Sequence, residues 1–290
     1  MSFTPGNDTD IRRVMLVGRD RVFYFGLLGQ PALRNFGCAT LYVSSGAPLQ
    51  VSFGQGWLEQ QLVWVPPYTP HRIRAVDRQL GVVMVEPESV DMAALEQCIA
   101  RSMRPGREVA FLERVFRGVA RLQQVAESGE LTTADFDLLF MGQYLPERPM
   151  DPRIRRVVER VCSGDMESCS AEALAGSEGL SFSRFLHLFK EETGVSLRKY
   201  RAWRRARSLL YHVTRDVSLT DIALETGYPD STHFSHSIRK IYGLSPRTIV
   251  AGSRRLRVKI QQDNAWQLSP EMALASSHKS VSGAAARVVA

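Results

Sequence analysis

Residues 172–196 read EALAGSEGLSFSRFLHLFKEETGVS, and residues 220–245 read TDIALETGYPDSTHFSHSIRKIYGLS. The two stretches repeat one pattern at an offset of 48 to 49 residues. The matched positions are Leu174 and Ile222, Ala175 and Ala223, Gly179 and Gly227, Phe185 and Phe234, Phe189 and Ile238, Gly194 and Gly243, and Ser196 and Ser245. Each copy reads as a short helix, a turn that carries glycine, and a second amphipathic helix. This order predicts two helix-turn-helix units, whose second helix lies in the major groove of DNA.

The positive charge of the chain is concentrated around this repeat. Residues 151–260 hold 20 Lys and Arg against 12 Asp and Glu, a net charge of +8, whereas residues 1–150 carry −1. A merely solvated basic face is the alternative for such an excess. Beside a duplicated DNA-binding motif, the excess indicates a surface that neutralises phosphates.

The second helix of each unit has an apolar face and a polar face. In the helix predicted from about residue 181 to 192, Phe185, Leu188 and Phe189 share one face, and Ser183, His187 and Lys190 share another. In the helix predicted from about residue 230 to 242, the inward positions are Phe234, Ile238 and Ile241, and the outward positions are Thr232, Ser235, His236 and Arg239. Because the apolar faces must be buried, the polar faces remain for DNA.

This region resembles the C-terminal DNA-binding domain of the AraC/XylS transcription regulators. The resemblance covers about residues 150 to 250 and is carried by Leu209, Leu210, Asp221, Ile222, Ala223, Gly227, Tyr228, Ser231, Phe234, Gly243, Ser245 and Pro246. In that family, one helix joins two helix-turn-helix units that read adjacent turns of DNA. The resemblance therefore implies an all-helical domain with double-stranded DNA as its partner.

By this resemblance, the residues best placed to read bases are Ser183, His187, Thr232 and His236, and Leu186 is placed to touch a thymine methyl group. The remaining candidate contacts on these helices are Ser181, Arg184, Lys190, Ser231, Ser235 and Arg239. The family commonly has arginine where His187 and His236 stand. The contacts of its other members therefore do not transfer directly to these two positions.

A third helix is predicted between the units, from Ser196 to about Val213. About 16 residues span roughly 24 Å at 1.5 Å per residue. Such a strut holds two reading helices near the ~34 Å separation of successive grooves, and DNA bending makes up a shortfall. Its apolar stripe is committed to packing, so its arginines, among them Arg204, Arg205 and Arg207, are expected to face phosphate.

The N-terminal half reads as short strands. Apolar or alternating runs separated by Gly, Pro, Asn and Asp occur at residues 14–17, 22–25, 40–43, 49–53, 61–65 and 81–85. They predict a barrel or a sandwich. Residues 65–71, VPPYTPH, are similar to the proline-rich turn ending in histidine of cupin-like barrels, which many AraC-family regulators carry as a sensing domain.

The histidines bear on whether this domain is an enzyme. A catalytic cupin binds its metal through several histidines and a carboxylate, but His71 alone of the six histidines lies in the predicted barrel. We therefore expect no enzymatic activity, no metal and no other cofactor. The alternative function is a cupin-type metal-dependent enzyme tethered to DNA, which stoichiometric bound metal would reveal.

A barrel without a catalytic set can still bind a small molecule. The segment is rich in aromatic residues, as apolar pockets often are, and the candidate ligand-binding residues are Phe25, Trp57, Trp64, His71 and Arg72. The alternative for each aromatic side chain is that it fills the core.

Helical periodicity begins at residue 108. Leu112, Val115, Phe116, Val119 and Leu122 recur at three and four residues after a Pro105-Gly106 break, which predicts an amphipathic helix over 108–127. The resemblance implies a dimerisation helix, and covering its own barrel is the equal alternative. Residues 146–152 predict a stiff linker, with Asp151 as N-cap and Pro152 as the first helical residue.

Two further features limit the class of protein. The four cysteines, at 38, 98, 162 and 169, have neither disulfide nor zinc spacing, so buried free thiols are expected, with a redox switch at Cys162 and Cys169 as the alternative. No apolar run approaches the ~18 residues of a membrane span, and the polar start lacks the features of a signal peptide. We therefore expect a cytoplasmic protein.

These observations predict an α+β protein with two domains and a tail. A cupin-like barrel or sandwich with dimerisation helices is expected at 1–148, an all-α double helix-turn-helix domain at 149–258, and a flexible tail at 259–290. The expected function is sequence-specific transcription regulation of the AraC type by a homodimer. A small-molecule effector and RNA polymerase are further expected partners.

Overall fold

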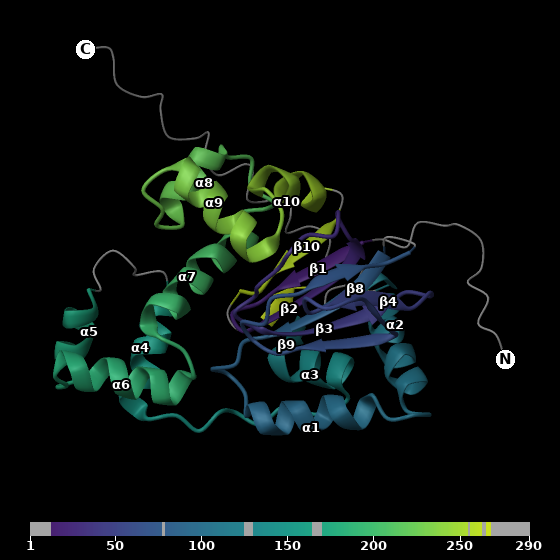
Figure 1. Cartoon of the computed structure of the whole chain (residues 1–290), viewed down its shortest axis with the longest axis horizontal. Helices are drawn as coiled ribbons and strands as arrows, with labels where there is room; N and C mark the ends of the chain where they lie inside the picture. The colour runs from purple at the N-terminus through teal and green to yellow at the C-terminus, as the bar shows by residue number, and fades with distance from the viewer. Residues whose placement is uncertain are drawn as a thin grey trace, which may run out of the picture.

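The computed structural model describes residues 13–76, 79–124, 130–163, 170–254, 256–262 and 265–267. Figure 1 shows a β-rich part with helices beneath it and a helical part beside and above it. Among the described residues, no helix is both long enough and apolar enough to cross a membrane.

The N-terminal domain is built on a six-stranded sheet with the order β10-β1-β2-β8-β3-β6. A smaller sheet, β5-β4-β7, packs over one of its faces through the buried Leu49, Val51 and Ile73. The strands that come before the first helix are β1 (Val14–Val17), β2 (Arg21–Leu27), β3 (Ala39–Ser44), β4 (Leu49–Ser52), β5 (Leu58–Gln60), β6 (Leu62–Val65), β7 (Arg72–Arg74) and β8 (Gln79–Val85). The predicted β-rich domain is confirmed, and the closer likeness to a cupin barrel stays a prediction.

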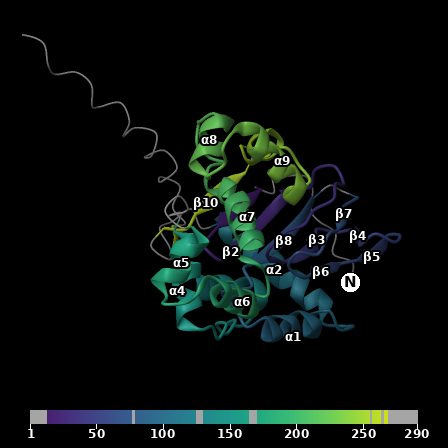
Figure 2. The same cartoon turned by 60° about the vertical axis from the view of Figure 1, so that its left-hand side comes forward.

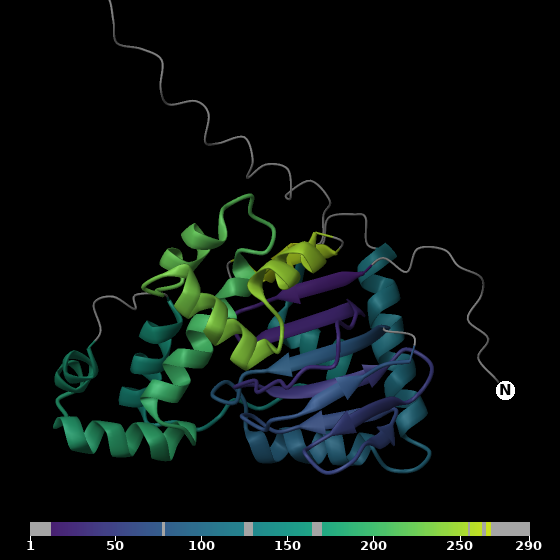
Figure 3. The same cartoon turned by 45° about the horizontal axis from the view of Figure 1, so that its top comes forward.

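Both faces of the large sheet are buried. All four residues of β1 and all six of β3 are buried, as expected of continuous apolar runs that lie between two layers. One face packs against α1 (Met92–Ser102), α2 (Glu108–Gln124) and α3 (Thr133–Met141). The other face packs against the small sheet and the C-terminal domain, as Figure 3 shows from above.

Helix α2 covers the sheet of its own domain. Phe111, Val115 and Val119 are buried in the core on that face, and the ring of Phe116 meets Phe25 edge-on with 6.0 Å between centroids. The predicted amphipathic helix is confirmed for Glu108–Gln124, in the covering role. Dimerisation through this helix stays a prediction.

The C-terminal domain is helical. The helices are α4 (Pro152–Cys162), α5 (Ala171–Ser177), α6 (Phe182–Thr193), α7 (Leu197–Ser208), α8 (Leu219–Glu225), α9 (Ser231–Tyr242) and α10 (Pro246–Ser253), with a 3-10 turn at Leu209–Tyr211 after α7. The first unit comprises α4 to α6, the second comprises α8 to α10, and α7 joins them (Figure 2). Asp151 caps α4 and Pro152 is its first residue, as predicted.

After the second unit, the chain returns to the N-terminal domain. Strand β10 (Arg257–Ile260) runs parallel to β1, with Met15 opposite Val258, and β11 (Ala265–Gln267) pairs with β9 (Glu130–Thr132). The predicted flexible tail is therefore wrong as far as residue 267, and the helical domain ends before β10. The short RVKI run carries two charges and has its pairing partner at the other end of the sequence, so no local pattern marks it as a strand. Residues 268–290 of the predicted tail lie outside the described part of the chain.

Candidate nucleic-acid interface

The two units are built from the same local signals. The side chain of Ser181 caps α6 by accepting the N–H of Arg184, and that of Asp230 caps α9 by accepting two backbone N–H groups. Gly194 and Gly243 end these helices with φ of 78° and 69°, a conformation that favours glycine. The predicted repeat of helix, turn and helix is confirmed at these positions.

The predicted apolar faces of α6 and α9 are buried except at Ile241, which is half-buried. Phe185 and Phe189 in α6, and Phe234 and Ile238 in α9, have no exposed surface. The faces predicted to be polar remain open. Ser181, Ser183, Arg184, His187, Lys190, Thr232, His236 and Arg239 are exposed, and Leu186, Ser231 and Ser235 are half-buried. Each of them stays a candidate DNA contact. The exposed Lys240 extends the basic end of α9, and its adjacency to Arg239 in the sequence was the available signal.

The α-helical part of the strut between the units, α7, has 12 residues, fewer than the about 16 that were predicted. Twelve residues of α7 and the three-residue 3-10 turn span about 24 Å at 1.5 and 2.0 Å per residue. Arg205 is half-buried, and its guanidinium lies 5.5 Å from the centre of the Tyr228 ring. Its phosphate contact stays a prediction.

The predicted phosphate contact of Arg204 is wrong for this structure, because the side chain is 8% exposed and faces the N-terminal domain. Its guanidinium lies 3.6 Å from carboxylate oxygens of both Glu86 and Glu88. The neighbouring Arg207 is 2% exposed, lies 2.5 Å from Glu86, and donates to the carbonyl of Gly18. The buried side of α7 is therefore a domain interface.

Two aromatic side chains of α7 complete this interface. Trp203 donates its indole N–H to Glu86 at 2.8 Å, and Tyr200 donates its hydroxyl to Glu88 at 2.9 Å. Burial beside Glu86 raises the pKa of Glu88 to about 7. Arg207 was expected to face phosphate with the other arginines of the strut, and its burial against Glu86 corrects that expectation. Sequence reasoning missed Glu86 and Glu88, because this acidic pair after β8 lies more than 100 residues from the arginines that it meets.

The five predicted ligand-binding residues do not share a cavity. Phe25 and Trp64 pack in or against the core on the helix-covered face of the sheet, and Arg72 is exposed. Trp57 lies at the surface, with the Arg74 guanidinium 4.0 Å from the centre of its ring. The predicted ligand set is therefore wrong as a group.

His71 has a structural role. It has no exposed surface, its Nδ1 lies 2.8 Å from the carbonyl of Thr69, and its Nε2 lies 2.7 Å from the Tyr42 hydroxyl. Burial lowers the pKa of His71 to about 4, so the ring is neutral at pH 7. Nδ1 then donates to Thr69 and Nε2 accepts from Tyr42.

A cavity of about 580 Å³ lies between the large sheet and the second unit. Most of its lining is apolar and includes Leu80 and Val82 from the sheet, and Leu210 and Leu256 from the C-terminal part. Two polar atoms of lining residues, Arg34 Nε and the Tyr242 hydroxyl oxygen, are buried without a hydrogen-bond partner. Unpaired buried polar atoms in an apolar cavity suit a ligand that carries a hydrogen-bonding group.

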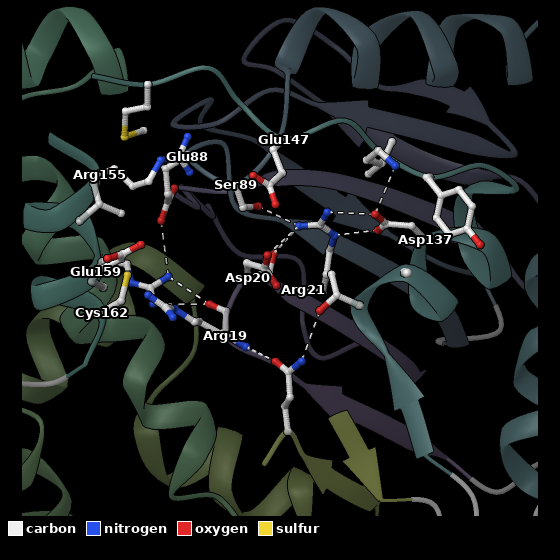
Figure 4. A pocket seen from close by; sticks show the side chains of 18 residues that line it. Arg19, Asp20, Arg21, Glu88, Ser89, Asp137, Glu147, Arg155, Glu159 and Cys162 are labelled. Carbon is white, nitrogen blue, oxygen red and sulfur yellow. Dashed lines mark hydrogen bonds and ion pairs between the residues drawn. The ribbon is translucent and has the colours of Figure 1, made fainter. Parts of the chain in front are cut away.

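A second cleft, of about 440 Å³, lies where the two domains and the linker meet. Its charges are largely paired within the protein: Arg21 donates to Asp137 at 2.8 and 3.1 Å and to Ser89 at 2.8 Å (Figure 4). In the described part of the chain, no group of three His, Cys, Asp or Glu residues could hold a metal ion.

Three cysteines lie in the described residues as free thiols. Cys38 and Cys98 are buried and Cys162 is half-buried, and burial raises the pKa of each thiol. The alternative of a redox switch between Cys162 and Cys169 involves a residue outside the described part of the chain.

Known proteins resemble both the C-terminal half and the overall fold. A protein-family model described as a helix-turn-helix domain matches residues 174–251. The HTH-type transcriptional activator RhaS of Escherichia fergusonii is 32% identical over 154 residues, which are 49% of this chain and 55% of RhaS. The chain thus matches about half the length of this relative.

Two solved structures are also similar. ToxT from Vibrio cholerae O395 is 11% identical, aligns over 80% of this chain and 96% of its own with a TM-score of 0.50, and so shares the fold. A transcriptional regulator from Chromobacterium violaceum, of the proteins that contain an AraC-type DNA-binding domain, is 25% identical over 36% of this chain and 92% of its own, with a TM-score of 0.33.

RhaS is a transcriptional activator rather than an enzyme. Residues 174–251 match the helix-turn-helix domain, and the two units within them repeat one set of caps, turn glycines and buried positions. In its duplicated unit, its match to the helix-turn-helix model and its activator relative, the chain is similar to AraC-type transcription regulators in its C-terminal half.

Proposed function

We propose that the chain binds specific DNA sequences through α6 and α9 and thereby regulates transcription in the cytosol. The observation that supports this most directly is the pair of exposed polar faces on helices whose opposite faces bury Phe185, Phe189, Phe234 and Ile238. Two such helices at the ends of one strut suit adjacent major grooves. Arg184, Lys190 and Arg239 supply positive charge for phosphates beside the base-reading positions.

The test is a binding measurement on DNA sites selected from a random pool by the full chain. Thr232→Ala is expected to cost about 1–3 kcal/mol on the selected site and little on unrelated DNA. Thr214→Ala, an exposed threonine outside the reading helices, is the matched control and should bind as the wild type does. Equal affinities of the two variants for the selected site would show that Thr232 of α9 does not read bases.

Loss of a phosphate contact should change the affinity for DNA and its salt dependence in a different way. Arg239→Ala should weaken binding to all sequences alike and reduce the slope of log affinity against log salt by about one. Arg117→Ala, on the exposed side of α2, should leave affinity and slope unchanged. A slope that stays unchanged in Arg239→Ala would place this arginine away from phosphate.

We also propose that the regulator acts as a homodimer through its N-terminal domain and contacts RNA polymerase. The family resemblance supports both, and a dimer would raise the effective concentration of the second pair of readers. Sedimentation of the full chain at micromolar concentration tests the dimer, and a monomer bound to one selected site would contradict it.

We infer that the 580 Å³ cavity is the effector site. Its apolar lining and the unpaired Arg34 Nε fit a largely apolar molecule with an anionic or hydrogen-bond-accepting group. Anilinonaphthalene sulfonate has this chemistry, and its fluorescence should rise on binding the full chain. Arg34→Met should weaken that binding, whereas Arg72→Met, at an exposed arginine outside the cavity, should not. Equal binding of the dye by both variants would show that it does not bind at Arg34 in this cavity.

A further inference from the structure

A cavity of about 470 Å³ lies along α7, between the end of α4 and the end of α8. It shares no lining residue with the 580 Å³ cavity. Among the described residues, its lining contains Arg204, Arg205 and Arg207 from α7 and one carboxylate, that of Glu225 from α8. We call it the second-unit cavity. Because arginines outnumber carboxylates in its lining, the cavity favours an anion.

The charged side chains of this cavity differ in whether the protein already pairs them. Arg204 and Arg207 pair with the acidic residues after β8. Glu225 accepts from Arg215, whose Nη2 lies 3.1 Å from its Oε1. Arg205, in contrast, has a buried Nε that lacks a hydrogen-bond partner in the described part of the chain. A ligand can therefore bind to Arg205 Nε without breaking an existing hydrogen bond of that atom.

The first unit supplies a comparison for this arginine. The pattern of α4 recurs in α7 at an offset of 49 residues, so Arg156 corresponds to Arg205. The turn between the last two helices of each motif recurs at an offset of 48, so Glu178 corresponds to Thr226. These two residues are the C-caps of α5 and α8, and each precedes a glycine of positive φ. The buried positions that match at the first offset are Ile154 and Trp203, Val157 and Ala206, and Val161 and Leu210.

In the first unit, the arginine binds a carboxylate of the chain itself. Arg156 donates to Oε2 of Glu178 from Nε at 3.0 Å and from Nη2 at 2.7 Å. The side chain of Glu178 is only 3% exposed, so its carboxylate has a fixed place beside the arginine. This ion pair joins α4 to the turn between α5 and α6.

The second unit has the arginine without the carboxylate. The hydroxyl of Thr226 donates to two carbonyl groups of α8, at 2.6 and 3.1 Å, and it carries no charge. Arg205 nevertheless lies against the same turn, because a Cβ at Gly227 would be 3.6 Å from its Nε. The second-unit cavity therefore presents a guanidinium where the first unit has a complete ion pair.

We propose that the second-unit cavity binds a small organic acid, whose carboxylate takes the place at Arg205 that the carboxylate of Glu178 has at Arg156. A guanidinium and a carboxylate form charge-assisted hydrogen bonds, which are stronger than those between neutral groups. The cavity volume of about 470 Å³ leaves room for an acid larger than the end of a glutamate side chain. The bound acid joins α7 to the turn before α9 and so completes the second unit in the way that Glu178 completes the first.

Propionate is the probe, because it reproduces the glutamate side chain beyond Cα, and propionamide is its neutral control. The full chain is titrated with each at constant ionic strength, and nuclear magnetic resonance follows the Arg205 Nε–H and the Gly227 amide. Both signals should shift with propionate until they saturate. Propionamide should bind at least about tenfold more weakly, because it lacks the charge. Equal binding of the two probes, or no saturable shift with propionate, would overturn the proposal.

Arginine variants locate the site. Arg205→Met should weaken propionate binding at least about tenfold, with the Gly227 amide as the reporter, because it removes the guanidinium and keeps much of the side-chain volume. Arg198→Met is the matched control, since Arg198 is an exposed arginine of the same helix. It should bind propionate as the wild type does. Equal affinities of the two variants would place propionate away from Arg205.

A carboxylate built into the chain tests the site without any ligand. Thr226→Glu supplies the side chain that the first unit has, so it should pair with Arg205 and prevent the shift with propionate. Arg205→Met should then lower the urea midpoint of unfolding more in the Thr226→Glu protein than in the wild type, because the ion pair exists only in that protein. Equal shifts of the midpoint in the two proteins would show that Arg205 is not placed to bind a carboxylate.

These measurements contain no DNA, so their outcome does not depend on the proposed DNA-binding function. Inorganic phosphate tests the chemical class of the ligand at the same two signals. Propionate should bind at Arg205 more tightly than phosphate does. Tighter binding of phosphate would overturn the carboxylate and favour a phosphate of the DNA backbone as the partner of Arg205.

Discussion

Arg207 is a deeply buried charge of the domain interface. It is 2% exposed and is shared between the Glu86 carboxylate and the carbonyl of Gly18. Arg207→Ala would leave Glu86 without this buried partner, so we expect a loss of about 3–5 kcal/mol in the free energy of unfolding. Arg198→Ala, at an exposed position of the same helix, should cost less than about 0.5 kcal/mol. Urea unfolding of the two full-length variants measures the difference, and equal losses would contradict the burial argument.

Glu88 makes stability depend on pH. Its pKa is raised from 4.5 to about 7 by burial beside Glu86, so between these values the folded protein holds a proton that the unfolded chain has lost. Its contribution to stability therefore falls as pH rises from about 4.5 to about 7. His71 acts in the opposite sense, because its folded pKa of about 4 costs stability as pH falls below about 6.5.

Comparison of the wild type with Glu88→Gln isolates the carboxylate. The variant should lack the fall between pH 4.5 and 7 and should be more stable than the wild type at pH 8. Denaturant midpoints at several pH values supply the measurement. A parallel pH profile for the two proteins would show that Glu88 is not held protonated by its surroundings.

The reading helices could be predicted because their determinants are local. The N-caps Ser181 and Asp230, the turn glycines and the apolar spacing each act within one or two turns of chain. The interface of α7 could not be predicted in this way. Helical spacing placed Arg204 beside other arginines on a polar stripe, and only the tertiary approach of Glu86 and Glu88 buries it. Strand β10 could not be predicted for the same reason, because its pairing partner β1 lies at the other end of the sequence.

Two glycines in equivalent positions test how far the units differ. Gly194 and Gly243 both end a reading helix with positive φ, so alanine is strained at either by about 1 kcal/mol. A Cβ at Gly194 meets nothing within 4 Å, whereas one at Gly243 lies 2.7 Å from Leu33 and 2.8 Å from Ala32. Gly243→Ala should therefore lower the free energy of unfolding more than Gly194→Ala. Similar losses in chemical denaturation would mean that the loop before Phe36 yields freely.

At the scale of the whole molecule, the hydrophobic cores do not follow the division of the sequence into two domains. The second helix-turn-helix unit shares its core with the sheet, and the first unit has its own. We expect amides in α8 to α10 to become exchangeable together with those of β1 and β2, and amides in α4 to α6 to open separately. Native-state hydrogen exchange at increasing urea measures this, and a common opening of both helix-turn-helix units apart from the sheet would contradict it.

The parallel pairing of β1 with β10 also bears on how the protein is made. A ribosome adds about 5–20 residues per second, so the partner of β1 emerges some tens of seconds after β1 itself. During that interval the outer edge of β1 has no partner strand and can template pairing with another nascent chain. Translation speed and chaperone supply, rather than final stability, would then govern how much of this regulator reaches its native form.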